Sequence, residues 1–218
     1  MTARICVSIL PKNGREALKL IEKAEAAHAD FIEVRLDRLE NNLGLAELAR
    51  HGKTPKIATD KSSRKETEHR QMLVSAAKGG FEYVDVDLST PQLEVLVKEL
   101  KMLGTKPIAS FHKFDASLSI SELNSILERE ISSGAEVCKI VITAKHVEDN
   151  LTALNFVSAA SGKAKVVCFC MGELGKVSRL LSPLFGSLFT FASLERGRET
   201  APGQIAIQDM RATYGLLR

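Results

Sequence analysis

The sequence lacks the long apolar runs and basic blocks that mark two broad classes of protein. No uninterrupted apolar stretch approaches the roughly 18 residues that a membrane-spanning helix needs, and no five basic residues follow one another. The 218 residues carry 30 Lys and Arg against 27 Asp and Glu, a formal net charge of only +3. We therefore expect no membrane association and no nucleic-acid partner, because a dedicated nucleic-acid binder concentrates basic charge.

Cysteines are also few, and none forms a C-x-x-C pair. Cys6, Cys138, Cys168 and Cys170 each lie within an apolar run, which predicts buried free thiols in a reducing compartment and disfavours a zinc site. The first residues lead directly into a strand-like run and lack the charged, apolar and cleavable regions of a secretory signal. These features predict a cytoplasmic protein that holds no metal ion.

No Gly-rich, Pro-rich or low-complexity linker interrupts the chain, so we expect a single domain over residues 1–218. Hydrophobic residues make up 44% and charged residues 26% of the sequence, which is typical of a globular chain with a sizeable core. Short apolar runs alternate with helix-period segments from end to end. Strands are predicted at residues 5–10, 31–36, 56–59, 83–88, 107–111, 137–143, 164–170 and 188–191.

Between these strands, apolar residues recur at the spacing of amphipathic helices. Pro91 is expected to open one helix, Ser119 or Ser121 to cap another, and the last helix to start near Gln204. The residues predicted to face inward are Ala17, Leu20, Ile21, Ala24, Met72, Leu73, Ala76, Ala77, Leu93, Leu96, Val97, Leu100, Ile120, Leu123, Leu127, Ile131, Val147, Leu151, Leu154, Val177, Leu180, Leu181, Ala206, Met210 and Leu217.

Eight strand–helix units in a chain of this length indicate an α/β fold, a (β/α)8 TIM barrel. A doubly wound sheet fits less well, because no G-x-G-x-x-G follows the first strand. In a TIM barrel, catalytic side chains lie at the carboxyl ends of the strands. Polar residues on the lumen faces near those ends are therefore the candidates for a functional site.

Two strands carry charged residues at every second position. Glu33 and Arg35 alternate with apolar residues in one, and Asp85 and Asp87 do so in the other. Period-2 alternation puts each pair on one face, which we expect to be the lumen. On this pattern alone, Glu33 and Arg35 suit a structural ion pair as well as a functional site, whereas pairing with lumen cations is favoured for Asp85 and Asp87.

The fifth and sixth strands carry candidate catalytic residues. His112 follows Ser110 on one face at a strand end, where an imidazole with a near-neutral pKa suits acid–base work. Lys139 lies inside an apolar strand. It either extends to the rim or is a desolvated amine with a lowered pKa that attacks carbonyl groups. Since the two strands are neighbours, we expect both side chains to reach one substrate.

A Gly-containing segment, residues 171–179, follows the seventh strand. Such loops often bind phosphate in barrels, but this one matches neither the Walker pattern nor a dinucleotide fingerprint. Arg179 at its end suits two interpretations. It is either a clamp for a carboxylate or phosphate or an ordinary solvated helix residue.

Taken together, these segments resemble the type I 3-dehydroquinate dehydratase family, the Schiff-base class of the shikimate pathway. The matching segments follow the same order as in the family and span nearly the whole chain. Each segment alone is a weak signal, but together they are specific. The matching segments are Glu33-Val34-Arg35-Leu36-Asp37, Ser110-Phe111-His112, Lys139-Ile140, Met171-Gly172 with Ser178-Arg179, Phe185-Gly186-Ser187 with Thr190-Phe191-Ala192, and Ala201-Pro202-Gly203-Gln204.

The resemblance implies dehydration of the small molecule 3-dehydroquinate to 3-dehydroshikimate without a metal or an organic cofactor. It implies that Lys139 forms the Schiff base, that His112 is the general acid–base, and that Glu33 fixes the imidazole tautomer. Neighbouring cations are expected to disfavour a protonated Lys139. The implied substrate-binding residues are Ser8, Arg35, Lys61, Met171, Arg179, Thr200 and Gln204.

The chain departs from the family pattern at two places. After the third strand the family usually has Thr-x-Arg followed by Glu-Gly-Gly, whereas residues 59–67 read TDKSSRKET. Lys61 falls on the Arg position and Arg64 is a nearby substitute, so both are candidates. Thr200 stands where many relatives have Ser and keeps the hydroxyl. The charged segment 195–200 suits either a mobile flap or an ordinary solvated loop.

Two other functions fit the same residues less well. A Schiff-base aldolase or transaldolase shares the buried lysine but usually needs a phosphate grip. A non-catalytic barrel that only binds a ligand has no need of Lys139, His112 and Glu33 on three separate strands. Relatives in the family are often dimers, so a homodimer is a further expectation.

Overall fold

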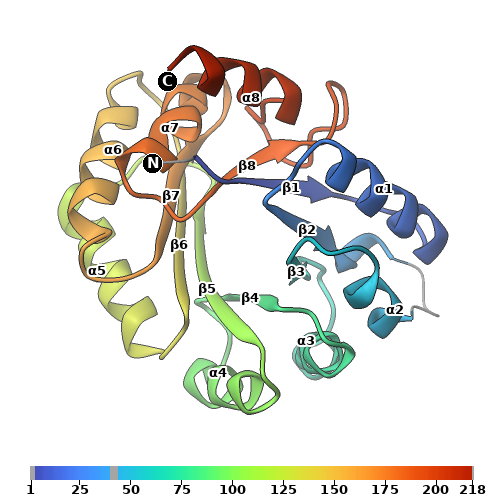
Figure 1. The fold of residues 1–218 in the computed structure, drawn as a ribbon. Helices are drawn as coiled ribbons and strands as arrows, with labels where there is room; N and C mark the ends of the chain where they lie inside the picture. The colour runs from blue at the N-terminus through green and yellow to red at the C-terminus, as the bar shows by residue number, and fades with distance from the viewer. Residues whose placement is uncertain (1–2, 40–43, 218) are drawn as a thin grey trace.

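The computed structural model describes residues 3–39 and 44–217, and their eight parallel strands curl around a common axis as predicted (Figure 1). The strand order is β7-β6-β5-β4-β3-β2-β1-β8. The described parts of β7 and β8 meet without a ladder, and Leu188 N donates to Val166 O at 2.7 Å near that seam. The strands are β1 (Ile5–Ile9), β2 (Phe31–Arg35), β3 (Lys56–Thr59), β4 (Tyr83–Asp87), β5 (Lys106–Lys113), β6 (Val137–Thr143), β7 (Val166–Met171) and β8 (Thr190–Ser193).

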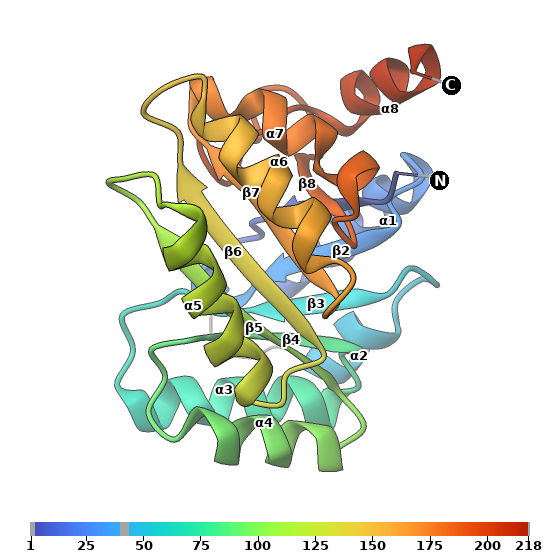
Figure 2. The same ribbon diagram turned by 90° about the vertical axis from the view of Figure 1, so that its left-hand side faces the viewer.

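Helices surround the strands and form the outer layer (Figures 1 and 2). Ser119 caps one of them in a capping box with Glu122, as the sequence predicts. None of the described helices is both long and apolar enough to cross a bilayer. The helices are α1 (Gly14–Ala26), α2 (Leu45–Arg50), α3 (Glu66–Gly79), α4 (Leu93–Met102), α5 (Ile120–Ser132), α6 (Asp149–Ala160), α7 (Lys176–Leu181) and α8 (Ile207–Leu216), with 3-10 turns η1 (Leu36–Arg38), η2 (Glu173–Gly175) and η3 (Ser182–Phe185).

Several predicted inward residues are instead exposed. Val147, Leu151 and Val177 are 59%, 61% and 48% exposed, and Leu217 is 54% exposed. Both α6 and α7 carry apolar residues on more than one side, so periodicity alone did not identify the buried face. Ile120 and Ile131 lie at the edges of the buried face of α5 and are also exposed. The residues that α6 and α7 bury are Asn150, Ala153, Leu154, Phe156, Val157, Ala160, Ser178 and Arg179.

Two helix starts also differ from the prediction. Pro91 does not open α4, because Gln92 adopts a left-handed conformation with φ of 51° and the helix begins at Leu93. The last helix, α8, begins at Ile207 rather than near Gln204. Gln204 therefore lies in the loop before α8, at the barrel mouth.

Alternation along the strands separates a helix-facing layer from the lumen, as predicted. Val34, Val86 and Ile140 belong to the large core between strands and helices. The lumen has an aromatic base, in which the rings of Phe31 and Phe189 lie 4.7 Å apart. Above this base, toward the carboxyl ends of the strands, the buried lumen residues become polar. The polar lumen residues are Ser8, Glu33, Thr59, Asp85, Ser110 and Lys139.

Glu130 is a charged residue in the helix-facing layer, fully buried on α5. Neither of its carboxylate oxygens has a hydrogen-bond partner in the described part of the chain, and burial raises its pKa well above the ordinary value of 4.5. Because the folded-state pKa exceeds the unfolded one, the destabilising effect is absent below the unfolded pKa. It grows as pH rises through the folded pKa.

Glu130→Gln is therefore expected to raise the free energy of unfolding at pH 8 by about 1–3 kcal/mol, because the neutral amide needs no proton to be buried and one unit of pKa shift is worth about 1.4 kcal/mol. The gain is expected to shrink toward pH 5, and calorimetric melting at several pH values measures it. The matched control is Glu128→Gln, which changes an exposed residue on the same helix and leaves stability nearly unchanged. An equal gain for Glu130→Gln at every pH contradicts the assignment.

Candidate active site

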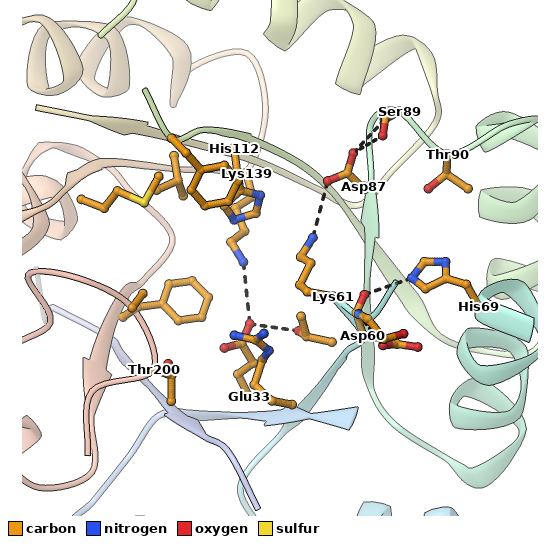
Figure 3. Close-up of a pocket in the computed structure, with 18 of the residues that line it drawn as sticks. Glu33, Asp60, Lys61, His69, Asp87, Ser89, Thr90, His112, Lys139 and Thr200 are labelled. Carbon is orange, nitrogen blue, oxygen red and sulfur yellow. Dashed lines mark hydrogen bonds and ion pairs between the residues drawn. The ribbon is translucent and has the colours of Figure 1, made fainter. Parts of the chain in front are cut away.

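A cavity of about 720 Å³ opens at the carboxyl ends of the strands (Figure 3). The predicted site residues come from separate strands and loops, yet all of them except Ser8 line this cavity. Ser8 lies behind Glu33, to which its hydroxyl donates. The predicted residues in the wall are Glu33, Arg35, Lys61, His112, Lys139, Met171, Arg179, Thr200 and Gln204, together with the alternative Arg64.

Lys139 is 4% exposed, and its Nζ points into the lumen rather than to the rim. Nζ donates to Asp85 Oδ2 at 2.9 Å and lies 3.7 Å from Glu33 Oε1. Burial alone lowers the pKa of this amine, but the Asp85 and Glu33 carboxylates outweigh burial and raise the pKa above its ordinary value. The expectation of a dry amine is therefore correct and that of an uncharged amine is wrong, because the nearest charges are anions.

Asp85 is the closest charged neighbour of Lys139, and its side chain is fully buried. Its second oxygen, Oδ1, accepts from Lys61 Nζ at 2.9 Å and from Ser110 Oγ at 2.7 Å. Burial raises the pKa of Asp85, but Lys139 and Lys61 more than offset this and hold the pKa far below its usual range. The sequence correctly favoured pairing with lumen cations for Asp85, but it gave no sign that Lys139 is one of the partners.

His112 lies near Lys139 on the neighbouring strand. The β5–β6 register sets Ser110 beside Lys139 and His112 beside Val141, two residues nearer the barrel mouth. Burial and the Lys139 and Lys61 cations hold the pKa of His112 well below its ordinary value of 6.5, so its imidazole is neutral at pH 7. The ring of Phe114 stacks on it with centroids 5.9 Å apart.

Glu33 does not bind the imidazole, which corrects the role implied by the resemblance. Its oxygens accept from Ser8 Oγ and, at 2.9 Å, from Thr59 Oγ1, and among the described residues no hydrogen bond joins it to His112. Thr200 Oγ1 donates to Ser8 Oγ at 2.9 Å and accepts from Gln204 Nε2 at 3.1 Å. These hydroxyls orient Glu33 toward Lys139 (Figure 3).

Arg179 is a buried cation and not a solvated helix residue. It is 1% exposed, its guanidinium lies 4.4 Å from the Phe169 ring, and its NH2 group donates to Pro202 O at 3.2 Å. Nε has no hydrogen-bond partner in the described chain. Burial lowers the pKa of Arg179 to about 10, so the group stays charged at pH 7. A buried cation without a carboxylate partner is suited to an anionic ligand.

The two candidates for the missing family arginine lie at different places in the cavity. Lys61 Nζ bonds Asp85 and Ser110 and lies 3.7 Å from Asp87 Oδ2. Arg64 Nε lies 3.3 Å from Asp60 Oδ2, on the loop before α3. Figure 3 shows Lys61 between the Lys139 side of the cavity and the side that Asp60 and His69 line. Lys61 is therefore the cation nearer to Lys139.

Some residues of the site carried no clear signal in the sequence. Thr59 donates to Glu33 and Ser110 donates to Asp85. In the sequence, only their place on the lumen side of the strand alternation could have indicated this. Apolar wall residues such as Val141 and Phe191 match the pattern of an ordinary core. In the loop after β8, Arg196 forms a two-point ion pair with Asp209 of α8 at 2.8 Å. The described residues contain no group of three His, Cys, Asp or Glu side chains placed to hold a metal ion.

Comparison with known sequences assigns the chain to one family. Residues 5–218 match the family model described as Type I 3-dehydroquinase. A 3-dehydroquinate dehydratase of Methanococcus maripaludis is 31% identical over 222 residues, which cover 98% of this chain and 99% of the relative. One from Dehalococcoides mccartyi is 35% identical over 217 residues and covers 96% of this chain and 94% of the relative.

Solved structures show the same fold. A 3-dehydroquinate dehydratase from Geobacillus kaustophilus superposes with a TM-score of 0.91 at 23% identity, covering 100% of this chain and 91% of that one. A type I enzyme from Clostridium difficile, with covalently modified comenic acid, gives a TM-score of 0.89 at 25% identity and covers 99% and 92%. The protein described as QR15, an aldolase, shares only the fold, with a TM-score of 0.62 at 14% identity over 97% and 96% of the two chains.

Proposed function

The chain belongs to the type I 3-dehydroquinate dehydratase family, and from this premise we propose how its residues dehydrate 3-dehydroquinate through a Schiff base. The observation that carries the proposal is the meeting of three groups in one cavity. These are a buried amine on Lys139, a neutral imidazole on His112 and the guanidinium of Arg179, which has no carboxylate partner among the described residues. They match the ketone, the acidic C–H bond and the carboxylate of 3-dehydroquinate.

Arg179 binds the substrate carboxylate. Its orphan Nε and its burial beside Phe169 leave a cation whose best partner is a small planar anion. Thr200 and Gln204 bond each other at the same side of the cavity, and both supply further polar contacts. Met171 is buried in the cavity wall and packs against the apolar part of the ring.

The ring hydroxyls lie on the opposite side, against Glu33, Arg35 and Lys61. Arg35 is fixed by Asp37 through two hydrogen bonds of 2.7 and 2.9 Å, so its remaining donors have a defined direction. Lys61 takes the place of the family arginine and Arg64 does not, because Arg64 is turned toward Asp60. Ser8 contributes by orienting Glu33.

The reaction begins when Lys139 Nζ transfers a proton to the neutral His112 and attacks the substrate ketone. His112 returns that proton to the carbinolamine hydroxyl, which leaves as water, so a protonated imine and a neutral imidazole remain. His112 then removes the C2 proton; the C–H electrons form a C2=C3 double bond, and the C=N electrons move onto nitrogen to give a neutral enamine. His112 next donates that proton to the C1 hydroxyl, which leaves as water, and hydrolysis frees Lys139. General acid–base help of this kind is worth about 10²–10⁴ in rate.

The direct test is ultraviolet absorbance. Adding 3-dehydroquinate to the purified protein is expected to produce the conjugated enone band of the product, at a rate proportional to protein concentration. Sugar phosphates are expected to give no retro-aldol cleavage, since the proposed reaction is a dehydration and breaks no C–C bond. Cleavage of a sugar phosphate without the enone band favours an aldolase and contradicts the proposal.

A homodimer through α6 and α7 is the assembly we propose. The exposed apolar residues Val147, Leu151, Leu174 and Val177 lie close together, because the Asn150 amide donates to both Val147 O and Leu174 O. Leu151→Lys is expected to convert dimer to monomer in equilibrium sedimentation. The control Val95→Lys alters an equally exposed apolar residue on α4 and keeps the dimer. A monomeric wild type contradicts the proposal.

A cytoplasmic location is also proposed. All four cysteines are free and buried, as the sequence predicts, and free thiols are typical of proteins from a reducing compartment.

A further inference from the structure

Asp85 is a residue that neither the resemblance nor the matched family description assigns a role. Its carboxylate lies between two ammonium groups, with Lys139 Nζ 2.9 Å from Oδ2 and Lys61 Nζ 2.9 Å from Oδ1. Ser110 completes the shell of Oδ1 at 2.7 Å. A fully buried carboxylate with three donors is costly to assemble unless its charge is needed.

The charge on Lys139 Nζ is conserved when the Schiff base forms. An ammonium and a ketone give a protonated imine and water, R–NH₃⁺ + O=CR₂ → R–NH⁺=CR₂ + H₂O. Two of the three N–H protons leave with the ketone oxygen and one stays on nitrogen. The resting state and the intermediate therefore need the same counter-ion at the same place.

We propose that Asp85 is a further catalytic residue, the counter-ion that keeps Lys139 Nζ positively charged from the resting ammonium to the protonated imine. This proposal rests on the Schiff-base function proposed above. The positive imine is the electron sink that makes the C2 proton acidic, and a neutral imine is a much weaker sink. An anion 2.9 Å away stabilises the protonated form.

Glu33 is less suited to this role than Asp85. It lies 3.7 Å from Nζ rather than 2.9 Å, and its oxygens already accept from Ser8 and Thr59. The charged and titratable groups that face Lys139 from the elements around it are Cys6 on β1, Glu33 on β2, Lys61 after β3, Asp85 on β4 and His112 on β5.

Lys61 and Ser110 keep Asp85 in place when the charge on Nζ disappears. Removal of the C2 proton turns the imine into a neutral enamine, so Asp85 loses one of its two cations for that step. Its other oxygen still binds Lys61 and Ser110, and the carboxylate stays oriented for the positive imine that returns when the hydroxyl leaves. The pair Lys61–Asp85 thus acts as a fixed electrostatic support.

The test measures how reductive trapping of the imine depends on pH. Cyanoborohydride reduces the protonated imine, so its adduct at Lys139, followed by mass spectrometry, decreases as the imine loses its proton. In Asp85→Asn this decrease is expected at a pH at least about one unit lower than in the wild type, since a close counter-ion typically shifts a pKa by about 1–3 units. The basic limb of kcat moves in the same direction.

Asp87→Asn is the matched control. It removes a carboxylate from the same strand that lies 3.7 Å from Lys61, and it is expected to leave the trapping profile in place. An adduct in Asp85→Asn with an unshifted profile overturns the role of Asp85 alone. A wild type that forms no adduct at Lys139 overturns the Schiff base itself, so the two failures are distinct.

A measurement on the wild type keeps the proposal testable even if Asp85→Asn does not fold. Mixing protein and substrate in weak buffer near pH 7 with an indicator dye is expected to show no net proton uptake, because the ammonium already carries the charge of the imine. Dehydration itself is proton-neutral and adds no signal. An uptake near one proton per site shows a neutral resting amine and overturns the proposal.

Discussion

Replacing Lys139 with Met is expected to lower kcat by more than about 10⁴-fold and to abolish the adduct that borohydride traps with substrate. The amine is the only group in this account that bonds covalently to the substrate, so its loss removes the electron sink for every later step. Mass spectrometry after borohydride treatment and the enone absorbance assay give the two readouts. Circular dichroism checks that the variant folds, because the removal of Lys139 leaves the buried Asp85 with Lys61 and Ser110 as its donors.

Lys56 provides an informative control for this experiment. It is another buried lysine, at the start of β3, and its Nζ donates to Thr54 O at 3.0 Å. Burial lowers the pKa of Lys56, whereas the pKa of Lys139 is raised. If a low amine pKa selected the nucleophile, the adduct would form at Lys56. We expect Lys56→Met to keep both adduct and turnover, because Lys139 lines the cavity and Lys56 is not among its lining residues.

The comparison of these two lysines shows what the sequence could and could not predict. Period-2 alternation placed Glu33 and Asp85 on the lumen faces correctly, because one side of every barrel strand must be covered by helices, whereas it left the direction of Lys139 open. The contact between Asp85 and Lys139 joins β4 to β6 across the lumen, and no local pattern encodes a distance between strands that are not neighbours. The sign of the pKa shift depends on that distance.

Local rules also failed where an apolar residue serves something other than the core. Val147, Leu151 and Val177 fit a helical period, yet they are exposed. In contrast, Arg179 looked like a surface residue by type and is buried against Phe169. Residue type predicts burial only when no ligand or partner is involved, and these exceptions fall on the proposed dimer face and the proposed carboxylate site.

His112→Gln is expected to lower kcat by about 10²–10⁴-fold, the usual contribution of a positioned acid–base group. Imine formation slows but continues, since water replaces the imidazole as a proton carrier, so borohydride still traps an adduct at Lys139. The elimination stops at that stage because no group of comparable basicity takes the C2 proton. Rapid-quench trapping measures the rate at which the adduct forms, and enone absorbance measures the rate of elimination. Comparing the two rates separates imine formation from elimination.

The same variant tests the lowered pKa of His112. Because only the neutral imidazole accepts a proton, kcat/KM in the wild type is expected to be flat at pH 7. It falls only well below pH 6.5, where the half-buried ring becomes protonated. His112→Gln removes this acid limb. His69→Gln, which changes the imidazole bonded to Asp60 O at the far side of the cavity, retains it. If kcat/KM of the wild type already falls at or above pH 6.5, burial and the neighbouring Lys139 and Lys61 do not lower the pKa of His112 as assigned. If the acid limb persists in His112→Gln, the titration belongs to another group.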